Sequence, residues 1–374
     1  MRKEFIIKEI EEGEILEAVN FHNEFSGGNR TVEEWRHEYK KYLKKHSIFT
    51  ILKDQDKIIG TIGFLPYYVN FNERKHLVGK GENVLIHPNY RNGVLFRRFF
   101  NFTLEIAKQK HMEYAVGRTQ LGLVWNRLLK FNAFPNIFSQ RMGVIKLRGL
   151  NKSLRTLVKR KYSSKSKQLF IRLGLIFCSV FLFRLTRFKM AITKISLASK
   201  KKDYEISSML RDNNDIIKLF QNLTQKQENL ICLNQDIDFL NWRIFNSQRL
   251  VYKTYFIYKK DKLDGYCYAT INIALNTAYL TDFTFNDIKS GKLLLHKVFS
   301  DFRKETAPLI FFFGNETNDV VNKSFNLLKK VGFIKIKNPT WFVIKGLSDT
   351  TNETQFNNIS NWHITSLWTE GFER

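Results

Sequence analysis

The sequence carries one arrangement of landmarks twice, and this repetition restricts the fold more than any other feature. Trp35 lies 25 residues before Gly60, and Trp242 lies 23 residues before Gly265. Each tryptophan is followed by an arginine, and each glycine lies in the second arm of an expected β-hairpin. A helical segment that closes on phenylalanine follows the two glycines by 74 and 68 residues. Landmarks repeated at such similar distances predict two copies of one structural unit.

The order of expected elements also repeats, as β-α-α-β-β-β-α-β-α-β in both copies. In the first copy we expect strands over 5–10, 47–52, 57–68, 84–86, 114–116 and 142–147, with helices over 12–25, 31–43, 94–108 and 121–131. In the second copy we expect strands over 204–209, 250–258, 263–274, 278–285, 309–314 and 334–344, with helices over 214–223, 237–243, 293–302 and 320–330. The sequence therefore predicts an α/β protein with mixed sheets, with domains at 1–148 and 203–374 and a linker at 149–202.

The stretch 82–100 has the pattern of a strand, a turn and a helix. Val84–Ile86 is a short apolar run typical of a buried strand. Pro88 and the pair Asn92–Gly93 mark a turn, and the apolar spacing becomes helical from Val94. Because a helix start has free N–H groups and the positive end of the helix dipole, this turn is expected to hold a phosphate group.

This stretch resembles the acetyl-CoA-binding motif of the GNAT acyltransferase superfamily, in which a strand ending near "V-x-P-x-Y-R" leads into a glycine-rich loop and a helix. Pro88, Tyr90 and Arg91 match the pattern, whereas its two glycine positions fall on Val94 and Phe96. Residues 330–333 of the second copy resemble another hallmark of the family, a helix closed by "Lys-Leu-Gly-Phe". The resemblance implies two GNAT-like domains in tandem, the first with a degenerate acetyl-CoA loop.

The resemblance also implies a reaction. GNAT enzymes bind acetyl-CoA or another acyl-CoA in a wedge between two central strands, where an amine attacks the thioester directly and no metal takes part. A backbone N–H of the strand before the loop polarises the thioester carbonyl, and the pyrophosphate lies on the N–H groups at the helix start. Carried over residue by residue, the cofactor-binding roles fall on Val84, Leu85, Ile86, Arg91, Asn92, Gly93, Val94, Leu95 and Phe96.

Two side chains beside the expected strand are candidates for the base that takes the proton from the amine. Glu82 is the nearest carboxylate, and His87 follows the strand. Either residue also fits a structural role, as a glutamate at a strand start or a histidine in a turn. The tyrosine with which many family members protonate the thiolate is absent, because its positions hold Leu129 and Leu328.

The second copy has no glycine-rich loop, so we interpret it as a half that binds the acceptor or serves as a scaffold. Asp282 and Arg243 are its candidates for an acceptor groove, together with Trp35 from the first copy. The alternative is structural, because a tryptophan beside an arginine often packs in a core while the arginine forms a salt bridge.

The middle of the chain is strongly basic. No Asp or Glu occurs from Tyr114 to Lys202, and this stretch holds 21 of the 61 Lys and Arg residues. Such a block indicates an anionic partner or surface. We expect Lys152–Lys167 to be an exposed linker, and the uncharged run Leu173–Phe183 to be too short to cross a membrane. Residues 152–202 then either pack against the two domains or lie in the interface of an anionic membrane.

The three cysteines are far apart and form no C-x-x-C pair, which argues against a disulfide framework or a zinc site and fits a reducing cytoplasm. No signal peptide is expected at Met1–Phe5. We therefore expect a cytoplasmic protein that is peripheral at the inner face of the membrane.

Three functions fit these observations. The leading hypothesis is an acetyl-CoA-dependent N-acetyltransferase that modifies an amine or amino sugar, on a small molecule or a glycan, in polysaccharide or cell-envelope synthesis. The second is a transferase of the type that builds peptidoglycan bridges from aminoacyl-tRNA, which does not use CoA and whose tRNA would bind the basic block. The third is a GNAT-like binding module without catalysis. The sequence does not indicate an oligomeric state.

Overall fold

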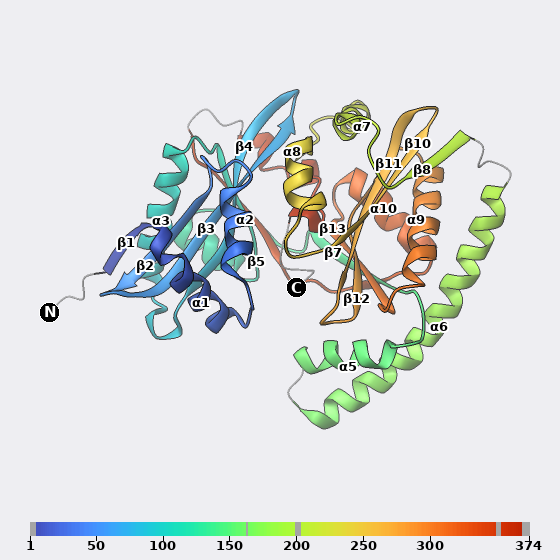
Figure 1. Ribbon diagram of the computed structural model, residues 1–374, viewed down its shortest axis with the longest axis horizontal. Coiled ribbons are helices and arrows are strands. Elements are labelled where there is room, and N and C mark those ends of the chain that lie inside the picture. The colour runs from blue at the N-terminus through green and yellow to red at the C-terminus, as the bar shows by residue number, and fades with distance from the viewer. Residues whose placement is uncertain (1–4, 162–163, 199–202, 349–352, 369–374) are drawn as a thin grey trace.

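The computed structural model describes residues 5–161, 164–198, 203–348 and 353–368. Two mixed α/β units lie side by side, a first half at residues 5–144 and a second half at residues 203–368 (Figure 1). Two helices connect them along the chain. The predicted α/β class and the two-copy arrangement are confirmed.

The first half contains two short 3₁₀-helices and four α-helices around its strands. Its elements are β1 (Phe5–Glu9), η1 (Glu12–Glu14), α1 (Ile15–Ser26), α2 (Val32–Lys40), β2 (Ile48–Asp54), β3 (Lys57–Phe71), β4 (Arg74–Ile86), η2 (Pro88–Tyr90), α3 (Gly93–Gln109), β5 (Tyr114–Thr119), α4 (Gly122–Leu129), β6 (Asn132–Phe134) and β7 (Phe138–Val144). The largest difference from expectation is β4, which begins at Arg74 rather than near Val84. It forms a two-residue hairpin with β3 because Asn72 and Glu73 both take positive φ values, of 47° and 61°.

The connecting helices and the second half complete the chain. Their elements are α5 (Leu150–Lys161), α6 (Lys165–Ala198), β8 (Tyr204–Ser207), α7 (Asp215–Thr224), β9 (Cys232–Leu233), α8 (Ile237–Leu240), η4 (Asn241–Phe245), β10 (Tyr252–Lys259), β11 (Lys262–Asn272), β12 (Thr277–Phe285), α9 (Ile288–Phe302), β13 (Leu309–Asn315), α10 (Asp319–Lys330), β14 (Ile334–Ile336), β15 (Trp341–Gly346), α11 (Glu353–Phe356), η5 (Ile359–Asn361) and η6 (Ser366–Trp368). The expectation of an exposed linker at Lys152–Lys167 does not hold at its start, because residues 150–161 form α5, and Leu150, Leu154 and Val158 are buried along one face of it.

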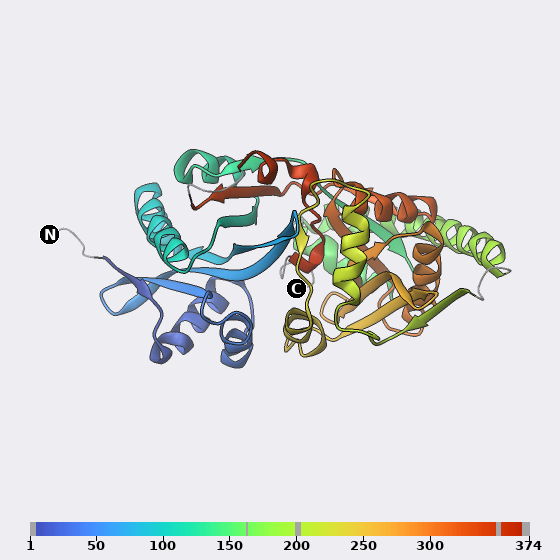
Figure 2. The same ribbon diagram turned by 90° about the horizontal axis from the view of Figure 1, so that it is seen from above.

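The two sheets exchange one strand each. The first sheet has the order β1-β2-β3-β4-β5-β15-β6, with β9 paired to β3, and the second has the order β14-β7-β13-β12-β11-β10-β8. Strand β15 therefore pairs with β5 of the first half, and β7 pairs with β13 of the second half. Figure 2 shows β15, in dark red, lying over the blue and teal first half. The division at 148 and 203 stays a prediction, but β7, which it assigns to the first domain, is a strand of the second sheet.

Helices cover the faces of both sheets. Helices α1 and α2 pack on one face of the first sheet, and α3 and α4 pack on the other, around Phe64, Phe100 and Trp125. In the second half, α9 and α10 cover one face and α7 the other. Helices α5 and α6 pack on β7 and its neighbours, where Leu182 lies in one cluster with Phe311.

Candidate functional site

The central parallel strands of the first sheet separate partway along their length. In the described residues, β4 pairs with β5 only from Val78–Lys80 against Tyr114–Val116. Strand β4 then continues to Ile86 and β5 to Thr119 without further pairing between them. Lys80 is the last residue of β4 that pairs with β5, so these two strands open into a wedge immediately after it. The wedge lies beside Val84–Ile86, the segment for which the sequence predicted one.

A bulge in β4 occupies the edge of this wedge. Thr61 of β3 pairs with Leu85, but Gly63 pairs with Glu82, so β4 has one more residue than its partner over this interval. Asn83 takes a left-handed conformation in the bulge, with φ of 52°. Its carbonyl oxygen accepts a hydrogen bond of 2.9 Å from the Thr61 hydroxyl, and its side-chain amide donates one of 2.6 Å to the Tyr39 hydroxyl.

Gly63 is required for this arrangement. A Cβ atom at Gly63 would overlap the Tyr39 hydroxyl, which reaches across β3 to Asn83. A glycine, a tyrosine of α2 and an asparagine of β4 therefore hold the bulge together. Its backbone is fixed in position before any ligand arrives.

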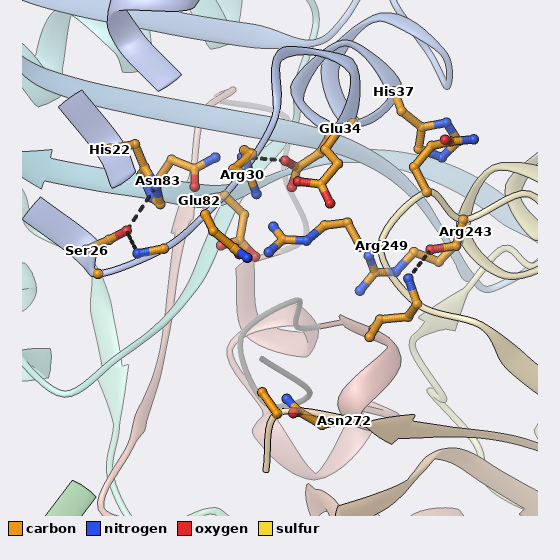
Figure 3. A pocket seen from close by; sticks show the side chains of 18 of the residues that line it. His22, Ser26, Arg30, Glu34, His37, Glu82, Asn83, Arg243, Arg249 and Asn272 are labelled. Atoms are coloured by element: carbon orange, nitrogen blue, oxygen red, sulfur yellow. Dashed lines mark hydrogen bonds and ion pairs between the residues drawn. The ribbon is translucent and has the colours of Figure 1, made fainter. Parts of the chain in front are cut away.

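A cavity of about 1060 Å³ lies between the two halves and borders the bulge (Figure 3). Its walls come from the end of α1 with the following turn and α2, from the bulged part of β4, and from two parts of the second half: η4 with the loop after it, and the end of β11 with the turn after it. The lining residues are His22, Ser26, Gly27, Gly28, Asn29, Arg30, Glu34, His37, Glu38, Glu82, Asn83, Val84, Leu85, Trp242, Arg243, Ser247, Gln248, Arg249, Leu250, Ile271, Asn272, Ile273 and Ala274.

Three charged side chains of the first half that line this cavity, Arg30, Glu38 and Glu82, are paired within that half. Arg30 and Glu38 form an ion pair at 2.6 Å, with side chains only 3% and 4% exposed. Asn23 holds the backbone of Arg30 through two hydrogen bonds of 2.8 Å. Glu82 pairs with the ammonium group of Lys80, which is buried at the point where the wedge opens. Glu82 thus lines the cavity while its charge is held by a neighbour on the same strand.

The second half contributes two arginines to the opposite wall. Arg243 and Arg249 both line the cavity, and Figure 3 shows their side chains facing Glu82 and Arg30 across it. The position of this wall is fixed by a reciprocal contact between the halves. The His37 ring lies 2.9 Å from the Trp242 carbonyl oxygen, and the Trp242 indole N–H donates a 3.0 Å hydrogen bond to the His37 carbonyl oxygen.

The predicted phosphate-binding turn is closed by its own side chain. Asn92 caps α3, and its side-chain oxygen accepts hydrogen bonds from the backbone N–H groups of Val94 and Leu95 at 2.8 and 3.4 Å. Val94, at a glycine position of the family motif, is 78% exposed. The Arg91 side chain bonds back to the Ile86 carbonyl oxygen at 3.2 Å. A pyrophosphate would have to displace the Asn92 side chain to reach the N–H groups of Val94 and Leu95.

The remaining predicted site residues lie in different places. His87 follows β4, accepts a hydrogen bond from the backbone N–H of Asn89 and packs against Phe25, outside the residues that line the cavity. Trp35 is buried and stacks on Tyr39, so it supports the bulge from behind. Arg243 lines the cavity, as expected for an acceptor groove.

Asp282 is the counterpart of Glu82 in the second half, but it is buried and lies outside the cavity. Gly63 pairs with Glu82 in the first sheet, and Tyr268 pairs with Asp282 at the equivalent position in the second. Asp282 is 1% exposed and accepts hydrogen bonds from the hydroxyls of Tyr266 and Thr284 at 2.9 and 3.0 Å. The carboxylate is part of a core network, so the expectation that it lines a groove is not met in this structure.

The second half also has a wedge, and the chain fills it. Strands β12 and β13 pair only up to Leu280 and Phe312. The segment 361–368 enters beyond that point, where Thr365 pairs with Gly314 and η6 packs against both strands. The His363 ring lies 3.1 Å from the Thr284 hydroxyl, and its burial lowers the pKa of the imidazole. The second wedge therefore has no room for a pantetheine arm.

Several of these residues were not predicted from the sequence. Lys80 was missed because the stretch before Val84 was not assigned to a strand, although Gly79-Lys80-Gly81 places a charge between two residues without side chains. Arg30 and Arg249 have no motif that marks them. Within the described part of the chain, no group of three or more His, Cys, Asp or Glu side chains is placed to hold a metal ion.

Comparison with known proteins identifies the fold. Residues 6–118 match the model of a family described as an acetyltransferase (GNAT) domain. No curated protein sequence matches the chain.

Solved structures with similar folds cover nearly the whole chain. A tandem GNAT protein from the clavulanic acid biosynthesis pathway matches 93% of this chain and 100% of its own, with a TM-score of 0.55 at 9% identity. GCN5-related N-acetyltransferases from Anabaena variabilis and Kribbella flavida each match 92% of this chain, covering 73% and 72% of their own, with TM-scores of 0.56 at 12% and 10% identity.

Proposed function

We propose that this chain transfers an acyl group from an acyl-CoA to an amine at the bulge of β4. The chain has the tandem GNAT fold, and its residues 6–118 match a GNAT acetyltransferase domain. The observation that carries this proposal is the position of the bulge. Asn83, Val84 and Leu85 lie between an open wedge, which suits the donor, and a cavity of about 1060 Å³, which suits the acceptor.

The reaction needs few protein groups. The amine nitrogen attacks the thioester carbonyl carbon, a C–N bond forms, the C–S bond breaks, and the electron pair leaves with the CoA sulfur. A backbone N–H of the bulge stabilises the developing oxyanion. Glu82 accepts the proton of the attacking amine, directly or through water, since it is the carboxylate of β4 that reaches the cavity. The thiolate can leave without a dedicated acid because a thiol pKa of about 8.5 makes it a tolerable leaving group.

The cavity supports a class of acceptor. Arg243 and Arg249 line the wall that faces Glu82, and guanidinium groups bind carboxylate or phosphate in bidentate geometry. We therefore propose an acceptor that carries both an amine and an anionic group. An amino acid, a small peptide or a phosphorylated amino sugar has this chemistry. A volume of this size accommodates a small molecule or the end of a larger one.

One observation favours a donor other than CoA. The Asn92 cap and the exposed Val94 occupy the helix start where CoA enzymes of this family hold the pyrophosphate. An aminoacyl-tRNA donor of the peptidoglycan-bridge type would not need that pyrophosphate-binding site. The two donors are distinguished by whether the purified protein binds acetyl-CoA or retains tRNA in a salt-sensitive manner.

The proposal is tested by thiol release from acetyl-CoA with a panel of amines matched in size, with and without a carboxylate or phosphate. We expect turnover with the anionic members, and a loss of roughly 10²-fold or more in Glu82→Gln. Glu73→Gln, an exposed carboxylate on the same hairpin, is the matched control. Because Glu82→Gln leaves Lys80 without its counter-charge, thermal melting and the double variant Lys80→Met/Glu82→Gln show whether the loss is structural. Turnover that is unchanged in Glu82→Gln, or faster with the neutral amines, contradicts the proposal.

A further inference from the structure

Helix α6 is apolar but not buried. It is long and apolar enough over Lys165–Ile192 to span a membrane by length and composition, whereas the expectation from the sequence considered only the shorter run Leu173–Phe183. Arg172 and Arg184 bound the uncharged run, but the helix continues well beyond both. Only 11% of its most apolar stretch is buried in the protein, which separates it from the core helix of a globular domain.

The topology excludes a crossing by this helix alone. Strand β7 precedes α6 in the chain, and β8 and β13 follow it, yet all three are strands of one sheet. Both ends of α6 must therefore lie on the same side of any bilayer. A single helix that starts and ends on one side can lie along a membrane but cannot span it.

Two opposite faces of α6 differ in what they contact. Ser179, Leu182, Thr186 and Met190 form a buried stripe against the second half. The opposite face carries Phe170, Leu173, Phe177, Phe181 and Phe188, which are between 56% and 82% exposed. We call these five residues the aromatic stripe. Figures 1 and 2 show α6 along the outer edge of the second half. The high exposure of its five residues means that the stripe faces away from the protein.

Positive charge surrounds the aromatic stripe. Arg184 and Arg187 are exposed on the same helix, and Lys165 and Lys167 are exposed at its start. No acidic residue occurs anywhere from Tyr114 to Lys202. A second copy of this face would bring like charges together with no carboxylate of this segment to offset them. A nucleic acid would satisfy the charges but would leave five apolar side chains in water.

We propose that the aromatic stripe of α6 inserts into the interfacial region of a membrane with anionic headgroups, with the helix axis parallel to the membrane plane. Such helices bury their apolar face about 5–10 Å below the headgroups and gain further binding from basic side chains near anionic lipids. This proposal does not depend on the acyl-transfer chemistry.

The membrane contact would place the cavity next to the lipid surface. Helix α5, which packs against α6, contacts the turn after β11, where the Ser153 hydroxyl donates a 2.9 Å hydrogen bond to the Asn276 carbonyl oxygen. The same turn supplies Ile273 and Ala274 to the cavity wall, and Ile273 is 89% exposed. An acceptor held at a membrane would thus reach the wall that carries the arginines without leaving the surface.

Vesicle flotation of the full chain tests the proposal. We expect the protein to float with vesicles of phosphatidylcholine and phosphatidylglycerol but not with phosphatidylcholine alone. Phe177→Ser/Phe181→Ser should weaken this binding roughly tenfold or more, because two inserted aromatic side chains are lost. Met209→Ser/Leu16→Ser removes two exposed apolar side chains elsewhere and should have no effect. Arg184→Glu/Arg187→Glu should also weaken binding, whereas the exposed pair Lys57→Glu/Lys262→Glu should change it little.

Cys178 provides an independent readout of insertion. It is exposed next to Phe177, whereas Cys232 and Cys267 are buried, so a polarity-sensitive thiol fluorophore attaches at this position selectively. Its emission should shift to the blue with the phosphatidylglycerol vesicles only. Three results would overturn the proposal: no flotation of the wild type, a dimer in solution that Phe177→Ser/Phe181→Ser dissociates, or binding to tRNA that the same double variant leaves intact while vesicles fail to bind.

Discussion

The side-chain amide of Asn83 donates a hydrogen bond of 2.6 Å to the Tyr39 hydroxyl, which joins the bulge of β4 to helix α2. This contact is possible only because Gly63 has no side chain between the two residues. Strand β4, which forms one wall of both the donor wedge and the acceptor cavity, is therefore held by a hydroxyl group of α2.

We expect Gly63→Ala to lower the free energy of unfolding by about 1–3 kcal/mol, because the new methyl group overlaps Tyr39. Tyr39→Phe alone should cost about 1 kcal/mol through the lost hydrogen bond. The double variant should be more stable than the sum of both losses predicts, because removing the hydroxyl relieves the closest overlap. Urea unfolding of the four proteins measures this coupling, and strict additivity would contradict the described geometry.

Asn92→Ala should change stability and ligand affinity in opposite directions. Loss of the cap should cost about 1 kcal/mol of stability, because two backbone N–H groups lose their acceptor. The same two groups become available to a phosphate, so the affinity for acetyl-CoA should rise. Asn318→Ala, which removes the cap of α10 in the second half, should lower stability without changing the affinity. Affinity that is unchanged in Asn92→Ala would show that this turn does not hold the pyrophosphate.

The free energy of unfolding should fall strongly when one partner of the ion pair between Arg30 and Glu38 is lost. Both side chains are almost completely buried, so Glu38→Gln should leave an uncompensated charge and cost about 3–5 kcal/mol. Replacing both partners, as Arg30→Met/Glu38→Leu, should restore much of that stability. Chemical denaturation measures the three free energies. A single variant as stable as the double variant would contradict the buried placement of the pair.

The exchanged strands should hold a cut chain together. We expect a protein with a protease site inserted between α5 and α6 to elute at its original size from a gel-filtration column after complete cleavage. Strand β7 of the first fragment remains paired in the second sheet, and β15 of the second fragment remains paired in the first. Separation of the fragments without denaturant would contradict the exchange.

Stability should fall with acid partly through His363. Burial lowers the pKa of this imidazole in the folded protein, whereas in the unfolded chain it returns to about 6.5. The unfolded state therefore binds a proton first as the pH falls, so this contribution is complete above about pH 6.5 and is lost below it. Unfolding free energies at pH 7.5 and 5.5 should differ more in the wild type than in His363→Asn. If the difference between the two pH values is equal in the wild type and in His363→Asn, the His363 side chain is exposed to solvent.

The sequence predicted the two-copy fold because its signals were local and repeated. Thr31 and Glu34 close the capping box that starts α2, and Asn92 lies at the start of α3, where a turn was expected. The exchange of β7 and β15 was not predictable in this way. A strand is recognised by its own apolar pattern, but the sheet that it joins depends on packing between segments far apart in the chain.

The candidate site was predicted only in part for the same reason. Val84, Glu82 and Arg243 were found because a motif or a repeated pair marked them, and the structure places all three on the cavity. Lys80 and Arg249 have no local signal, since their importance depends on where two strands separate and on which loop faces them. The filling of the second wedge by residues 361–368 depends on a tail with no counterpart in the first copy.

The measurement that tests the central claim most directly is the stoichiometry of acetyl-CoA binding by isothermal titration. We expect one molecule per chain, because the first wedge is open and the second is filled by the chain itself. We also expect Val94→Glu to abolish the binding by placing a carboxylate at the phosphate-binding turn, whereas Leu16→Glu, at an exposed position on α1, should leave the binding unchanged. No binding by the wild type, two molecules per chain, or binding that Val94→Glu does not affect would contradict this claim.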